Sequence, residues 1–151
     1  MALPSHHLAQ LNIARFREAM DSPANAGFVA ELDPINEIAD NADGFIWRLQ
    51  DDSGNATSIQ FYDDPLQLVN MSVWRDLESL RAFVYRSAHV EIFKRRLEWA
   101  DPLPDAHQVL WWIPAGHIPD VAEADERLQQ LRREGPSPTA FTFASPQPPP
   151  T

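Results

Sequence analysis

The stretch SVWRDLESLRAFVYRSAHVEIFKRRLEWADPLPDAHQVLWWIPAGH, residues 72–117, decides the fold of this chain. A strand is predicted to end at Val73-Trp74, and a long helix follows with Ser87-Ala88-His89 near its middle, where it can break into two pieces. After the connector 99–104, a second strand is predicted over residues 108–113. The stretch holds four of the five Trp and six of the twelve basic residues, so we expect any chemical site to border it.

Upstream of this stretch, the pattern predicts three strands and one helix. Residues 6–13 alternate as a strand, with Leu8, Gln10 and Asn12 on one face. A helix begins near Ser22-Pro23, is kinked or restarted at Pro34, and ends at Asp43-Gly44. Further strands are predicted over 45–50 and 66–74, separated by a turn at 51–55 and irregular residues 56–65.

Downstream, a helix with Val121, Ala124, Leu128 and Leu131 on its apolar face is predicted to end at Gly135-Pro136. A short edge strand follows over 139–143. We predict one domain over residues 1–143 and a disordered Pro-rich tail over 144–151.

The predicted element order is β-α-β-β-α-β followed by α-β, in which the first six elements form the split βαβ, or ferredoxin-like, α+β arrangement. This order predicts an antiparallel sheet with two helices on one face. The other face carries many apolar groups, and we expect a second copy of the chain to cover it in a homodimer.

Composition excludes several classes of function. The formal net charge of −10 argues against nucleic acid and anionic membranes as partners. The chain has no cysteine, which excludes disulfides and Cys-based metal or thiol chemistry. No signal peptide and no membrane span are recognisable, so we expect a cytoplasmic protein. No His-Glu-x-x-His motif, phosphate loop or nucleophile elbow occurs, and no metal site is predicted.

The charge is unevenly distributed along the chain. Residues 75–96 contain six basic and three acidic side chains, a net charge of +3 in an acidic protein. Two interpretations remain open: ion pairs on a solvated helix face, or a positive rim for an anionic small molecule.

Several stretches resemble one known family. They are residues 7–14 and 44–49, His89-Val90-Glu91-Ile92-Phe93-Lys94-Arg95-Arg96, the run Leu110 to Pro119 with Trp111-Trp112, Glu123-Ala124, and Ala140-Phe141-Thr142-Phe143. Over residues 6–143 the chain resembles the family named domain of unknown function 3291. That family looks related to the dimeric α+β barrel superfamily, which includes the antibiotic biosynthesis monooxygenases and haem-degrading monooxygenases. The resemblance implies a homodimeric α+β barrel, and it leaves the reaction open.

The resemblance suggests two sets of roles. Haem-degrading relatives use an Asn on the first strand, a Trp on the third and a His on the following helix, matching Asn12, Trp74 and His89 in order. Cofactor-free relatives hold a phenolic or enolic substrate that reacts with oxygen itself, so that the protein deprotonates, orients and excludes water. Both interpretations make Asn12, Trp74 and His89 the catalytic candidates, although His89 packed between Tyr85 and Phe93 is the structural alternative.

The predicted substrate site lies on the face of the third strand that carries Asn70, Ser72 and Trp74. The predicted substrate-binding residues are Asn70, Ser72, Arg48, Tyr85 and Trp112. Trp111 and Trp112 must point to opposite sheet faces, one under the helices and one toward the dimer interior. As an alternative, the polar groups satisfy each other at the dimer interface.

We therefore expect a small-molecule enzyme that resembles the cofactor-independent monooxygenases and acts on an aromatic or enolisable substrate, as in secondary metabolism. The alternatives are a cyclase or isomerase on the same fold, a haem protein using His89, and a non-catalytic ligand-binding or structural dimer.

Overall fold

The computed structural model describes residues 5–50, 62, 64–86, 89–103 and 105–150. The predicted turn at 51–55 and most of the segment 56–65 lie outside these residues. The described elements, in chain order, are strand β1 (His6–Phe16), the 3-10 turn η1 (Pro23–Asn25), helix α1 (Ala26–Asp40), strands β2 (Phe45–Arg48) and β3 (Gln67–Trp74), helices α2 (Leu77–Arg86) and α3 (His89–Lys94), the 3-10 turn η2 (Arg96–Glu98), strands β4 (Ala100–Asp101) and β5 (Gln108–Pro114), and helix α4 (Val121–Glu134).

Strand β1 lies at the centre of a five-stranded antiparallel sheet within the described residues. One edge of β1 pairs with β3, and β3 pairs in turn with β2. The other edge pairs with β5 along its first half and with β4 at its end. The order β2-β3-β1-β5, with all neighbours antiparallel, is consistent with the predicted ferredoxin-like arrangement.

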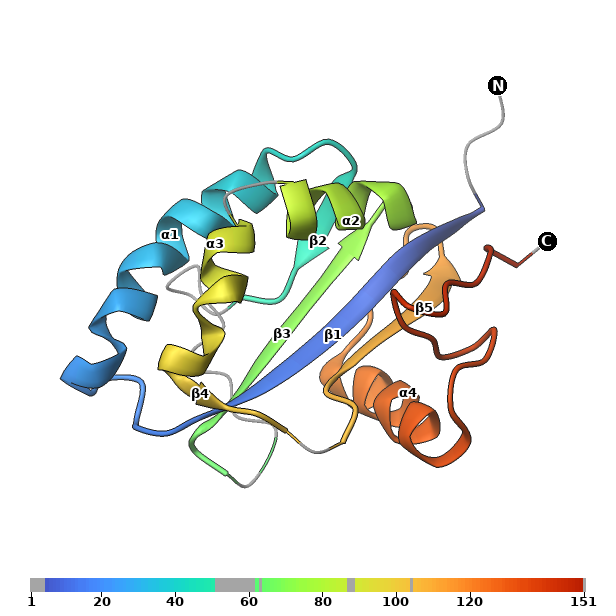
Figure 1. Cartoon of the computed structure of the whole chain (residues 1–151). Coiled ribbons are helices and arrows are strands. Elements are labelled where there is room, and N and C mark those ends of the chain that lie inside the picture. Colours follow the sequence, from blue (N-terminus) through green and yellow to red (C-terminus); the bar gives the residue numbers. More distant parts are fainter. Residues whose placement is uncertain (1–4, 51–61, 63, 87–88, 104, 151) are drawn as a thin grey trace.

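Helices cover both faces of the sheet. Figure 1 shows α1, α2 and α3 on one side and α4 on the other. The α4 face is one continuous apolar core in which Leu128 packs against strand residues such as Leu11, Met71 and Trp111. On the opposite face the apolar residues form two separate clusters, one around Trp74 and Leu110 and the other around Phe16 and Trp99.

Helix α4 changes the argument for a homodimer. We expected the second apolar face of the sheet to be covered by another copy of the chain. Nine strand residues of that face are instead at most 2% exposed within a single chain, beneath α4: Ala9, Leu11, Ile13, Val69, Met71, Val73, Val109, Trp111 and Ile113. The expectation of an uncovered face is therefore wrong, and self-association would have to use another surface.

The predicted helix boundaries are mostly confirmed by their caps. The Asp76 carboxylate accepts from the backbone N–H of Ser79 at the start of α2, and Asp120 accepts from Glu123 at the start of α4. Helix α2 ends at Arg86 and α3 begins at His89, and Ser87-Ala88 of the predicted break lie outside the described residues. Pro34, however, lies inside the single helix α1 and does not begin a second one.

Three features of the connecting and C-terminal segments differ from expectation. Strand β4 was not predicted, because two residues are too few to show a period. The predicted edge strand at 139–143 is reduced to isolated bridges, in which Phe141 pairs with Leu110. In the segment expected to be a disordered tail, the Gln147 carbonyl accepts a hydrogen bond of 3.0 Å from Trp112 Nε1.

None of the helices in the described part of the chain is long and apolar enough to cross a membrane.

Gly44 joins α1 to the sheet at a position that only glycine fits. Its φ is +84°, and a Cβ added there would lie 2.1 Å from Ser79 Oγ and 2.4 Å from Ser79 Cβ. We expect Gly44→Ala to lower the free energy of unfolding by about 2–4 kcal/mol, because a left-handed conformation and an overpacked contact both become unfavourable. Urea denaturation measures this loss.

Gly116 offers a matched control, since its φ is +92° and nothing lies within 4 Å of an added Cβ. Gly116→Ala should lower the free energy of unfolding only by the cost of the left-handed backbone conformation, about 1 kcal/mol. Equal losses in the two variants would contradict the close approach of Gly44 to α2.

Candidate functional site

Polar side chains gather in the middle of the sheet face that α1, α2 and α3 cover. The cross-strand register places Asn12 opposite both Asn70 and Gln108, and Gln10 opposite Ser72, which in turn pairs with Arg48. Residues directly opposite each other in a sheet project from the same face. We call this set the polar band; its members are Gln10, Asn12, Arg48, Asn70, Ser72 and Gln108.

Hydrogen bonds join the centre of the polar band into a network. Gln10 Nε2 donates to Asn70 Oδ1 at 2.8 Å and to Ser72 Oγ at 2.9 Å. Trp74 Nε1 donates to the same Ser72 Oγ at 2.8 Å. Gln10 and Ser72 are 4% and 8% exposed, so these bonds form in surroundings where an unpaired polar group would be costly.

The outer part of the polar band is open to other partners. Asn70 is exposed although it lies on β3, a strand that pairs with β1, and Asn12 opposite it is half-buried. Within the described part of the chain, the Asn12 side chain has no hydrogen bond. A half-buried amide without a protein partner must be satisfied by water or by a ligand.

Aromatic residues flank the polar band on both sides. Toward one end, Trp74 stacks on Phe83 with ring centroids 5.1 Å apart and meets Phe45 edge-on at 5.5 Å. Toward the other end, Phe16 meets Phe28 edge-on at 4.8 Å, and Trp99 lies beyond. An apolar surface with a few convergent polar groups is typical of sites for small organic molecules.

Arg48 brings the one cationic side chain of the polar band, and a carboxylate neutralises it. Its Nε donates to Asp40 Oδ1 at 2.8 Å and its Nη2 to Asp40 Oδ2 at 3.3 Å. The Arg48 side chain is only 13% exposed. This ion pair ties the end of α1 to β2 and leaves the band close to electrically neutral.

The structure brings together five of the predicted site residues and separates others. Asn12, Asn70, Ser72, Trp74 and Arg48 all lie on the predicted sheet face. Trp74, at 1% exposure, contributes its N–H to Ser72 and cannot present its ring to solvent.

The remaining predicted residues lie elsewhere or are less well defined. Tyr85 is 46% exposed and packs edge-on against Phe143, outside the polar band. Trp112 shares the sheet face but packs against Phe141 with the two rings tilted, and its Nε1 donates to the Gln147 carbonyl of the C-terminal segment. His89 is the first residue of α3, and its side chain lies outside the described part of the structure.

Trp111 points to the opposite face from Trp112, as predicted. It is buried beneath α4, where its Nε1 donates to Glu123 Oε2 at 3.0 Å, while Glu123 Oε1 lies 2.7 Å from His117 Nε2. Within the single chain, α4 covers Trp111, and the C-terminal segment contacts Trp112 through the Gln147 carbonyl.

The basic excess at residues 75–96 is largely matched by carboxylates. Arg75 pairs with Asp43 and Asp76, Arg86 with Glu78, and Arg95 with Glu98. These exposed pairs follow the ion-pair interpretation and do not form a positive rim.

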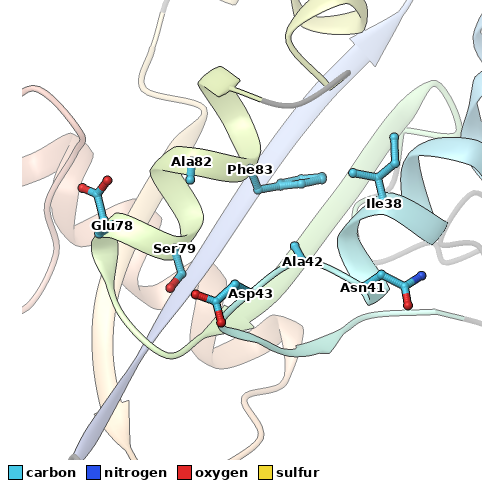
Figure 2. Close-up of a pocket in the computed structure, with 8 residues that line it drawn as sticks. All are labelled: Ile38, Asn41, Ala42, Asp43, Glu78, Ser79, Ala82 and Phe83. Carbon is cyan, nitrogen blue, oxygen red and sulfur yellow. The ribbon is translucent and has the colours of Figure 1, made fainter.

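A separate groove of about 520 Å³ lies between the end of α1 and the face of α2. In Figure 2, Phe83 reaches across it toward Ile38, and Asp43, Glu78 and Ser79 stand at its rim. None of the six polar-band residues lines it. Phe83, which lines the groove, stacks on Trp74, and Trp74 in turn donates to Ser72 of the polar band.

Asp76 holds the rim of this groove in place. Burial alone would raise the pKa of Asp76, but hydrogen bonds from the Ser79 hydroxyl and backbone N–H and the Arg75 guanidinium together lower it below its ordinary value. The carboxylate therefore stays ionised at neutral pH, where it caps α2 and anchors Arg75.

Two members of the polar band were missed as site residues. The alternation of β1 places Gln10 on the face of Asn12, so the sequence contained the signal for it. Gln108 begins β5, and only the register of β5 against β1 shows that it faces Asn12.

Comparison with known proteins gives the chain's relatives. The sequence profile of the family described as "Domain of unknown function (DUF3291)" matches residues 7–151. No curated protein sequence matches the chain. The fold is similar to the crystal structure of PA3566 from Pseudomonas aeruginosa, at 12% identity, a TM-score of 0.49, and coverage of 78% of this chain and 100% of that one. It is also similar to NE2512, a protein of unknown function from Nitrosomonas europaea, at 10% identity, a TM-score of 0.46, and coverage of 77% and 97%.

The network around Ser72 makes a testable prediction about stability. Ser72→Ala leaves the Trp74 N–H and one Gln10 N–H unpaired, so we expect the free energy of unfolding to fall by about 1–3 kcal/mol. In a double-mutant cycle with Trp74→Phe, the double variant should lose about 1 kcal/mol less than the sum of the losses in the two single variants. Urea denaturation gives all four values.

Ser5→Ala provides the control, since Ser5 is exposed and its substitution should change stability by no more than about 0.5 kcal/mol. Strictly additive losses in the cycle would show that Ser72 and Trp74 are not coupled.

Proposed function

The chain belongs to the family described as Domain of unknown function (DUF3291), and from this premise we propose that it is a small-molecule enzyme resembling the cofactor-independent monooxygenases. Its substrate would be an aromatic or enolisable compound bound at the polar band. The observation that carries the proposal is the polar band itself, in which the exposed Asn70 and the Asn12 amide, which has no hydrogen bond within the described residues, lie between two aromatic clusters.

The composition of the polar band suits such a substrate. Amide and hydroxyl groups can orient a carbonyl or enolate oxygen, while the partly buried Phe83 provides apolar surface for a ring. Because the Asp40 carboxylate neutralises Arg48, the polar band has no net charge that would attract a strongly ionic ligand. Positioning and exclusion of water are the contributions that cofactor-free oxygenation requires of a protein.

The proposed reaction is balanced without a cofactor. A methylene group next to a carbonyl loses a proton to form an enolate, and the enolate transfers an electron to O₂. The two radicals then join through a new C–O bond. The resulting peroxide takes up the proton and loses water, so that CH₂ and O₂ become C=O and H₂O. We assign proton removal to His89, and orientation of the enolate oxygen to Asn12 and Asn70.

Anthrone is a suitable probe, because it enolises and its expected product is anthraquinone. We expect the protein to accelerate oxygen uptake and anthraquinone formation above the rate in buffer, with no loss on addition of EDTA. Asn12→Leu and Asn70→Leu should each lower the rate about tenfold or more, because a hydrogen bond to a developing charge is lost. An oxygen electrode and product absorbance measure both quantities.

Arg17→Gln is the matched control, since Arg17 directly follows β1 and pairs at an exposed position with Asp101 of β4, away from the polar band. It should leave the anthrone rate unchanged. A rate equal to that in buffer would contradict the monooxygenase proposal. A sharp Soret band on addition of hemin, lost in His89→Ala, would favour the haem alternative instead.

We further propose that the chain is a homodimer, on the resemblance to the dimeric α+β barrels. The α4-covered face cannot serve as the sheet-to-sheet interface while α4 occupies it. Sedimentation velocity at micromolar concentration should give the mass of two chains. A stable monomer of 151 residues would contradict this assembly.

A further inference from the structure

The Ser72 hydroxyl has its acceptor capacity filled by two donors of the protein. A serine hydroxyl has one hydrogen to donate and two lone pairs that accept. Gln10 Nε2 and Trp74 Nε1 both donate to Ser72 Oγ, at 2.9 and 2.8 Å. An indole N–H can only donate, so the direction of the second bond is fixed. The hydroxyl hydrogen is therefore the one group that Ser72 can still offer.

Gln10 fixes the direction of Asn70 in the same way. Its two amide hydrogens serve Asn70 Oδ1 and Ser72 Oγ. Because the oxygen of Asn70 accepts from Gln10, its NH₂ group is left for another partner. Gln10 is 4% exposed, whereas Asn70 is exposed, so the buried amide sets the polarity of groups nearer the solvent.

We propose that Gln10 is a positioning residue that presets Ser72 and Asn70 as hydrogen-bond donors, so that the polar band selects ligands by an acceptor oxygen. The ligand class is a compact ring compound carrying a carbonyl, enolate or phenolate oxygen and no donor at that position. This inference rests on the proposed binding site, but it does not depend on any turnover there.

A reversal of this polarity is the sharpest test. In Gln10→Glu, the introduced carboxylate can only accept, so it takes the Ser72 hydroxyl hydrogen and a hydrogen from the Asn70 amide. Ser72 then offers a lone pair to the polar band, and Asn70 offers its oxygen. One substitution of nearly equal volume should thus convert donors into acceptors.

Two ring compounds of similar size probe the polarity. In 1,4-naphthoquinone the polar groups only accept, whereas 1,5-diaminonaphthalene presents N–H donors. Because the chain has no cysteine, the quinone meets no thiol that would add to it. Dissociation constants come from titrations followed by the ¹⁵N-¹H signals of the Trp74 indole and the Asn70 side chain.

The unsubstituted protein should bind the quinone at least about tenfold more tightly than the diamine, because the quinone accepts a hydrogen bond from the polar band and the diamine leaves that donor unpaired. In Gln10→Glu at pH 8 the ratio should shift toward the diamine by about tenfold or more. As the pH falls and the introduced carboxyl takes up a proton, the ratio should return toward that of the unsubstituted protein. The unsubstituted protein should show no such change with pH.

Other outcomes overturn the inference. Equal loss of affinity for both probes in Gln10→Glu would assign Gln10 a structural role alone, and so would a ratio that does not vary with pH. Failure of the unsubstituted protein to bind the quinone at millimolar concentration would contradict the donor polarity. If urea titration shows that the Gln10→Glu chain is not folded, Trp74→Phe takes its place. Removal of the indole N–H frees a lone pair of Ser72 and should lower the preference for the quinone.

The anthrone experiment separates this inference from the proposed reaction. Quinone preference that reverses in Gln10→Glu, without any oxygenation of anthrone, supports the preset donors and rejects the monooxygenase. Oxygenation of anthrone with an unchanged probe ratio in Gln10→Glu supports the monooxygenase and rejects the preset donors.

Discussion

The pairing of β1 with β3 is the constraint on which the rest of this structure depends. Eight consecutive residue pairs, from Leu8 opposite Trp74 to Arg15 opposite Gln67, fix the register. A shift by one residue would exchange the two faces of the sheet and place the polar band in the apolar core under α4. With the register fixed, Gln10 meets Ser72 and Asn12 meets Asn70, and the network follows from hydrogen-bond geometry alone.

The two faces of the sheet differ in how their apolar and polar residues are distributed. The α4 face is uniformly apolar, and close packing of residues such as Trp111 and Leu128 stabilises the fold there. The face under α1, α2 and α3 has its apolar residues divided into two clusters. Polar groups between them reduce the area available for hydrophobic stabilisation, and such a reduction is common where a protein binds a ligand.

The buried network also explains why Trp74 occupies its position. Its ring packs against Phe45 and Phe83, and its N–H orients Ser72. The same side chain therefore connects the apolar cluster to the polar band. In the proposed binding site, a substitution at Trp74 would change both stability and ligand selection, whereas substitutions at Gln10 or Asn70 would act mainly on the polar band.

The sequence by itself determined the element order, the caps of α2 and α4, and the grouping of Asn70, Ser72 and Trp74 on one face, because these depend on local periodicity and hydrogen bonding. Only the tertiary structure decided what each face packs against. Helix α4 was predicted, but its docking beneath Trp111 depends on contacts distant in sequence. The position of Tyr85 outside the polar band and of Gln108 within it likewise follows from packing and strand register, which single-strand alternation cannot specify.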